Sequence, residues 1–168
     1  NDESNGNFTL SSGGTGTVTD IDGNVYQTVV IGNQEWMAEN LKVSKYRDSS
    51  AIPTGHSNSA WANLSTSAYA VDKDNVANAV TYGYLYNWYA VVDSRNIAPE
   101  GWHVPTDEEW TVLTDYLGGE KMAGGKLKEA GTSPNVGATN ESGFTALPGG
   151  FRSSLGSYYD IGKSGYFW

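Results

Sequence analysis

The sequence predicts an α+β fold, and three observations support that prediction. A run of β-prone residues from 17 to 43 is broken twice by turn sequences. Two later stretches, about 85–92 and 107–117, place apolar residues at helical spacing. Glycine accounts for 21 of the 168 residues and hydrophobic residues for only 38%, so long irregular loops and a small core are expected around these elements. A chain of this length accommodates one domain.

Composition and charge argue against several classes of function. The formal net charge is −9 and only ten residues are Lys or Arg, which argues against binding to nucleic acid or to anionic lipid. Without cysteine the chain forms no disulfide, thiolate zinc site or cysteine nucleophile. No run of 18 or more apolar residues occurs, so no membrane insertion is expected.

The polar residues 1–16 are expected to form an N-terminal extension, followed by one domain over residues 17–168. The extension has the composition of a mature N-terminus after processing, so an extracellular or bacterial cell-surface location is expected. It contains one apolar alternation, Phe8 and Leu10, which is the pattern of a short β-strand.

Residues 17–43 are predicted to form a β-meander, with turns at "DGN" (22–24) and "GNQ" (32–34). Asp20, Asp22 and Asn24 alternate as the ligands of an EF-hand calcium loop do. That loop also needs a bidentate acid at its twelfth position, and this position is Ile31. A hairpin turn is therefore the preferred interpretation, with calcium as a weaker alternative and no other cofactor expected.

The aromatic stretch "TYGYLYNWYAVV" (81–92) contains two periodicities. Alternating aromatics from Tyr82 to Trp88 favour a strand, whereas Leu85, Trp88, Tyr89 and Val92 follow the spacing of a helix. We expect a short extended entry followed by a helix over about 85–92.

The stretch "GWHVPTDEEW" (101–110) predicts the start of the second helix, over about 107–117. Thr106 and Glu109 have the spacing of a capping box, and the acids between them suit the helix N-terminus. Trp110, Leu113 and Leu117 then share one face, and two glycines follow.

The two histidines have structural interpretations. His103 has no partner for catalysis or metal binding that the sequence reveals, and His56 is expected to be a solvated loop residue. No spacing of Ser, His and Asp or of paired carboxylates is persuasive, so no catalytic residue is predicted and the protein is expected not to be an enzyme. Arg152 is expected to pair with an acid as a structural clamp.

Five motifs resemble one known family. "TVTDIDGNVYQTVVIGNQEWMAENLKVSKYRD", "YGYLYNWYAVVD", "APEGWHVPTDEEWTVLTDYLGG", "AGGKLKEAGT" and "GATNESGFTALPGGFR" are similar, in order, to the Fibrobacter succinogenes major paralogous domain. The same pattern more distantly resembles the C-type-lectin-like and formylglycine-generating-enzyme fold. The resemblance implies a small, twisted antiparallel sheet with two helices and long loops, in secreted or surface-attached bacterial proteins without an established enzymatic activity. The copper chemistry of formylglycine-generating enzymes does not carry over to this chain, because it needs cysteines and the chain has none.

The resemblance also implies that strands are missing at the C-terminal end. Domains of this family usually continue through several more strands beyond the motif that is here "SGYFW" (164–168). A truncated sheet leaves unpaired main-chain groups on a strand edge, so either the sequence is part of a longer protein or another chain pairs these groups. In the second case we expect Phe8 and Leu10 to belong to a strand donated to a neighbouring copy, which would build a fibre because head-to-tail donation does not close.

The expected function is thus a secreted, non-enzymatic structural subunit of an extracellular or cell-surface assembly. The alternative is a surface-exposed lectin-like module that binds glycan or protein. The calcium-binding triplets of C-type lectins are absent, so glycan binding would depend on stacking against Tyr158, Tyr159 and Trp168.

Overall fold

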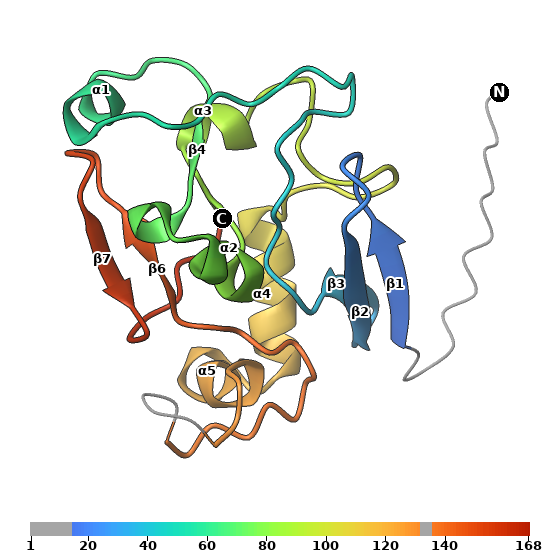
Figure 1. Cartoon of the computed structure of the whole chain (residues 1–168). Helices are drawn as coiled ribbons and strands as arrows, with labels where there is room; N and C mark the ends of the chain where they lie inside the picture. Colours follow the sequence, from blue (N-terminus) through green and yellow to red (C-terminus); the bar gives the residue numbers. More distant parts are fainter. Residues whose placement is uncertain (1–14, 132–135) are drawn as a thin grey trace, which may run out of the picture.

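The structure, a computed structural model, describes residues 15–131 and 136–168 (Figure 1). Over these residues the chain combines helices with small antiparallel sheets, which confirms the α+β prediction at that level. Phe8 and Leu10 lie outside the described residues. Within the described ranges no helix has both the length and the apolar character needed to cross a bilayer.

The first sheet is the predicted β-meander, with strand order β1–β2–β3. It consists of β1 (Thr15–Thr19), β2 (Val25–Ile31) and β3 (Gln34–Met37), all antiparallel. Gly23 and Gly32 have positive φ angles of 84° and 64° at the two turns, a conformation that glycine adopts without strain. β1 begins two residues before the expected boundary at 17.

The remaining strands form two separate hairpins, so the single small sheet that was expected is divided into three. β4 (Tyr69–Ala70) pairs with β5 (Leu85–Tyr86), and β6 (Gly149–Arg152) pairs with β7 (Tyr158–Ile161). On its other side β6 forms a parallel bridge from Gly150 to Gly165. The C-terminal residues therefore run beside β6.

Of the two predicted helices, the second is confirmed and the first is wrong in its N-terminal half. α4 (Asp107–Tyr116) begins with the complete Thr106–Glu109 capping box. In the first stretch, Leu85 and Tyr86 pair with β4, and Asn87 then caps α3 (Trp88–Val91) by accepting a hydrogen bond from the Ala90 N–H. The other helices are α1 (Asn58–Ala62), the 3₁₀-helix η1 (Asp72–Asp74), α2 (Val76–Tyr82) and α5 (Glu120–Leu127).

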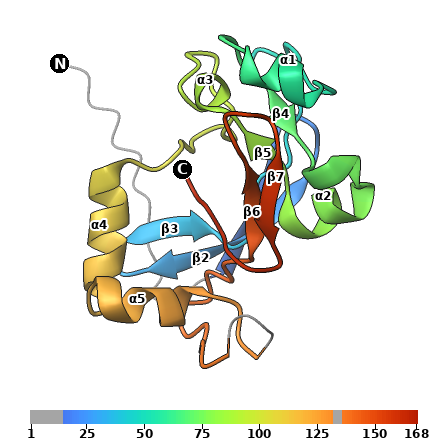
Figure 2. The same ribbon diagram turned by 90° about the vertical axis from the view of Figure 1, so that its left-hand side faces the viewer.

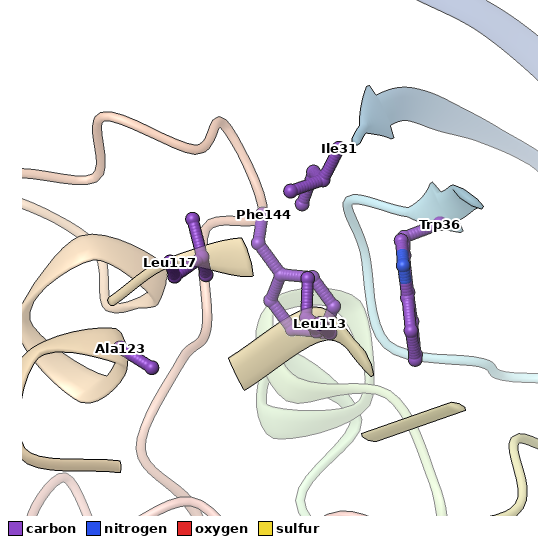
Figure 3. Packing of buried hydrophobic residues seen from close by; sticks show 6 residues of the cluster. All are labelled: Ile31, Trp36, Leu113, Leu117, Ala123 and Phe144. Carbon is purple, nitrogen blue, oxygen red and sulfur yellow. The ribbon is translucent and has the colours of Figure 1, made fainter. Parts of the chain in front are cut away.

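The main core cluster joins the meander to α4 and α5. It contains Ile31, Trp36, Leu113, Leu117, Ala123 and Phe144 (Figure 3). The side chains of Leu113 and Leu117 lie on the face of α4 that the sequence predicts to be buried. Figure 2 shows α4 and α5 beside β2 and β3, with the β6–β7 hairpin on the other side of the molecule and the C-terminal end between them.

Candidate functional site

The described surface has a groove along β3. A cavity of about 560 Å³ is lined by residues 33–41, by the loop 101–105, by the start of α4 and by Phe167 and Trp168. An adjoining hollow of about 190 Å³ shares Met37, Leu41, Trp102 and the C-terminal aromatics with it. The larger cavity has the volume typical of ligand sites. We call the two together the β3 groove.

A cluster of aromatic rings lines part of the β3 groove. The ring centroids of Trp36 and Trp110 lie 4.8 Å apart, and that of Phe144 lies 5.8 Å from Trp36. Phe167 from the C-terminal segment joins them, with its ring 6.3 Å from Trp110 and 6.0 Å from Phe144. Such packing of tilted rings favours a rigid, apolar surface.

Arg47 holds the loop that forms one wall of the groove. Its guanidinium donates hydrogen bonds to the carbonyl oxygens of Ala98 and Pro99, at 2.8 and 2.5 Å, and to that of Trp102. Three carbonyls from five consecutive residues are thereby bound to one rigid donor group. The loop presents Trp102 and His103 to the groove in a fixed position.

The C-terminal segment crosses the groove. The Trp110 indole N–H donates to the main-chain oxygen of Trp168 (2.9 Å), and the Trp168 indole N–H donates to the Tyr86 carbonyl (3.1 Å). Even so, Phe167 and Trp168 remain 42% and 49% exposed. These two side chains therefore border the groove without filling it.

The rim of the groove is acidic. The groove lining contains Glu35, Glu39 and Glu109 but no Lys or Arg. Glu109 also contacts His103, whose Nε2 lies 2.8 and 2.9 Å from the two carboxylate oxygens. Hydrogen bonds from the Thr106 main chain and from His103 lower the pKa of Glu109. His103 thus has a partner that the sequence did not reveal.

On its outer edge, β3 has main-chain groups that point away from β2 in the plane of the sheet. Hydrogen-bonded and outward-facing residues alternate along an antiparallel strand. The Ala38 N–H donates to the Gln27 carbonyl, which, with the register Val29 to Trp36, directs Trp36 and Ala38 toward β2. The main-chain groups of Glu35 and Met37 therefore point away from β2, and over the described ranges β3 is an edge strand.

Two polar atoms on β3 are buried without a hydrogen-bond partner among the described residues, the Trp36 indole Nε1 and the Gln34 Oε1. The amide nitrogen of the same Gln34 side chain donates to the Glu109 carbonyl (3.1 Å). A buried polar atom left unpaired costs roughly 1–3 kcal/mol. Two residues of the groove lining thus carry buried polar atoms whose hydrogen-bonding capacity is unused among the described residues.

The weak calcium candidates lie in the β1–β2 turn, where protein donors engage their carboxylates. Asp20 accepts hydrogen bonds from the main chain of Asp22 and Asn24, from the Asn24 side chain and from the Tyr26 hydroxyl. Asp22 instead accepts two bonds from Ser44 and forms an ion pair with Lys45. This geometry fits the hairpin turn. Over the described ranges no group of three His, Cys, Asp or Glu side chains is arranged to hold a metal ion.

The three stacking candidates lie in different surroundings. Tyr158 packs with Trp61 and beneath the Arg152 guanidinium, and Tyr159 stacks on Phe151. Trp168 lies instead beside Trp88, with ring centroids 5.6 Å apart, and both rings are about half exposed. Of the three candidates, Trp168 lines the β3 groove and the two tyrosines do not; its partner Trp88 was expected only as a residue of a helix face.

Arg152 and His56 differ from their sequence interpretations. The Arg152 guanidinium donates to the carbonyls of Gly156 and His56 and stacks on Trp61, so it clamps main chain and rings where an acid was expected. His56 is half-buried, not solvated, and its Nε2 is among the buried atoms without a partner in the described residues.

Comparisons with known proteins identify the family. A search of curated proteins and a search of solved structures both found no match. The family model of the Fibrobacter succinogenes major domain matches residues 29–168, from the middle of β2 to Trp168 and including all of the β3 groove. The chain belongs to the Fibrobacter succinogenes major domain family.

Proposed function

We propose that the protein is a secreted, non-enzymatic structural subunit of an extracellular or cell-surface assembly whose copies are joined by strand complementation. The observation that carries this proposal is the β3 groove: an open aromatic cavity of about 560 Å³ beside a strand edge with outward-facing main-chain groups. A donated strand needs both features, because main-chain pairing supplies affinity and side-chain pockets supply specificity.

The donor in this proposal is the segment around Phe8 and Leu10 of a neighbouring copy. In a strand, these two side chains point to one face and Thr9 to the other. Because donor and acceptor are different surfaces of one chain, the contact is head-to-tail and builds a fibre unless the rotation closes a ring.

A C-type-lectin-like arrangement is part of the same proposal. Small antiparallel sheets, short helices and long loops support it, as does the parallel bridge that places residue 165 beside β6.

The test compares the assembly state of the full chain with that of a Phe8→Ser/Leu10→Ser variant and a matched Thr9→Ser variant. Light scattering and electron microscopy would report particle size, and circular dichroism the fold. We expect polymers of the 18.0 kDa subunit for the full chain and for Thr9→Ser, and folded monomers for the double variant. Monomers in all three would overturn the proposal.

A second candidate function is glycan binding, which is favoured by the exposed Trp88–Trp168 pair. Both rings have free surface, and hydrogen bonds fix Trp168, so the pair forms a rigid stacking platform. Binding to immobilised polysaccharide that is lost in Trp88→Ala and kept in Phe8→Ser/Leu10→Ser would favour this function. Absence of binding to a broad polysaccharide panel would remove it.

A further inference from the structure

We infer that the acceptor edge is β3, not β1, and that its occupant is residues 6–13 of a second copy, a segment with no acidic residue. This inference rests on the proposed strand complementation and specifies its site. It specifies which main-chain groups of β3 pair with the segment, which side chains of the segment become buried, and that negative charge on the segment weakens binding.

The choice of β3 follows from comparing the two edges of the meander. On β1, the Asp20 N–H donates to the Asn24 carbonyl, so Val18 pairs with β2 while Thr17 and Thr19 face outward. The side chains of Thr17 and Thr19 are exposed, and no residue of β1 lines the β3 groove. On β3 the outward groups of Glu35 and Met37 border the groove. Over the described residues, the β3 edge of this sheet combines main-chain pairing with an apolar cavity for side chains and the β1 edge does not.

The side chains of the segment fit the groove by their alternation. A strand that adds to β3 places every second side chain on the same face as Trp36. Phe8 and Leu10 are two residues apart and would enter together, near Trp36, Trp110 and Phe167. Thr9 would point to the other face, so the segment needs no polar group inside the aromatic lining.

The carboxylates beside β3 also restrict the charge of the segment that can bind there. Glu35 is hydrogen-bonded to the Thr28 hydroxyl, Glu39 accepts from the Gln27 N–H and Glu109 contacts His103. Over the described residues none of these three carboxylates forms an ion pair with Lys or Arg. The three carboxylates therefore keep negative charge beside the β3 edge, that of Glu35 on the sheet face opposite Trp36, and this charge disfavours an acidic segment. Residues 6–13, "GNFTLSSG", are uncharged, and Asp2 and Glu3 precede them by at least three residues.

The experiment uses the full chain carrying Phe8→Ser/Leu10→Ser, so that its own donor segment does not compete. A labelled peptide with the sequence of residues 6–13 is titrated by fluorescence anisotropy, together with versions flanked by Lys or by Asp. We expect binding in the order Lys-flanked, native, Asp-flanked, with about tenfold between the extremes at low salt and a smaller ratio at high salt.

Two proline variants then identify the edge. Met37→Pro removes an outward N–H of β3, and Thr17→Pro removes an outward N–H of β1; edge strands tolerate such prolines. We expect Met37→Pro to weaken peptide binding at least about tenfold and Thr17→Pro to leave it unchanged. If Met37→Pro fails to fold, Glu35→Gln/Glu39→Gln is the substitute, and it should reduce the difference between Lys- and Asp-flanked peptides.

Each outcome has a definite meaning. Loss of binding in Thr17→Pro alone, or no peptide binding at all, overturns the inference. Full-chain polymers that persist with Met37→Pro overturn it while leaving strand complementation intact. Peptide binding in the expected pattern by a chain that never polymerises supports the groove assignment and overturns the proposed function.

Discussion

Replacing Tyr26 by Phe tests the hydrogen-bond network that fixes the meander. The Tyr26 side chain is fully buried. Its hydroxyl donates to the Asp20 carboxylate at 2.6 Å and accepts from the Lys42 N–H at 3.0 Å. It thereby links the β1–β2 turn to the segment that leaves β3 and borders the groove. Phe keeps the ring and leaves no cavity, so the variant isolates the hydroxyl.

The expected loss in the free energy of unfolding is about 3 kcal/mol. Roughly 1.5–3 kcal/mol belongs to the hydrogen bond with the charged Asp20, and about 1 kcal/mol to the amide of Lys42, which would be left without this acceptor. With a urea m-value of about 2 kcal/mol/M, the midpoint would fall by about 1.5 M. Tyr116→Phe is the matched control, because its side chain is 65% exposed; we expect a change under about 0.5 kcal/mol there.

The same variant has a defined pH signature. Burial, and then the hydrogen bond to Asp20, raise the pKa of Tyr26. The unfolded phenol ionises near pH 10, whereas the folded state retains its proton. The stabilisation is therefore complete below about pH 10 and is lost above it, by up to about 1.4 kcal/mol per pH unit. Tyr26→Phe should lack this alkaline component. A variant as stable as the parent at pH 7, with the same alkaline slope, would show that the Tyr26 hydroxyl does not stabilise the meander.

Three further predictions concern stability. Leu113→Ala, at a fully buried position of α4, should cost about 3 kcal/mol in urea unfolding, whereas the neighbouring half-exposed Val112→Ala should be close to neutral; equal effects would contradict the packing of α4. Thr106→Ala removes the cap of α4 and should cost about 1 kcal/mol in the same assay, and no loss would show that the capping box is dispensable. Calcium at about 1 mM should leave the thermal midpoint unchanged, because Asp20 already accepts four hydrogen bonds; a rise of several degrees would reinstate the calcium interpretation.

Elements that depend on contacts between residues close in sequence were predicted correctly, whereas elements that depend on distant contacts were not. The start of α4 is determined by residues three apart, Thr106 and Glu109, and the sequence predicted it correctly. The start of α3 was predicted at residue 85, because Leu85 fits a helical spacing. Pairing with Tyr69 and Ala70, about 15 residues earlier in the chain, overrides that local preference.

The groove itself could not be predicted, because its parts are distant in the sequence. It brings together Trp36, Trp110, Phe144 and Phe167, and only the folded chain places them side by side. The His103–Glu109 contact was missed for a related reason. The six-residue spacing fits no regular element, and the contact forms because Glu109 folds back onto the Thr106 main chain.

Hydrogen exchange of individual main-chain amides in polymers and in the Phe8→Ser/Leu10→Ser monomer tests strand complementation at β3 most directly. We expect the amides facing outward from β3, those of Glu35 and Met37, to become protected in the polymer, while the outward amides of Thr17 and Thr19 on β1 exchange as fast as in the monomer. Protection at β1 with none at β3, or identical exchange at both edges in the two samples, would contradict this expectation.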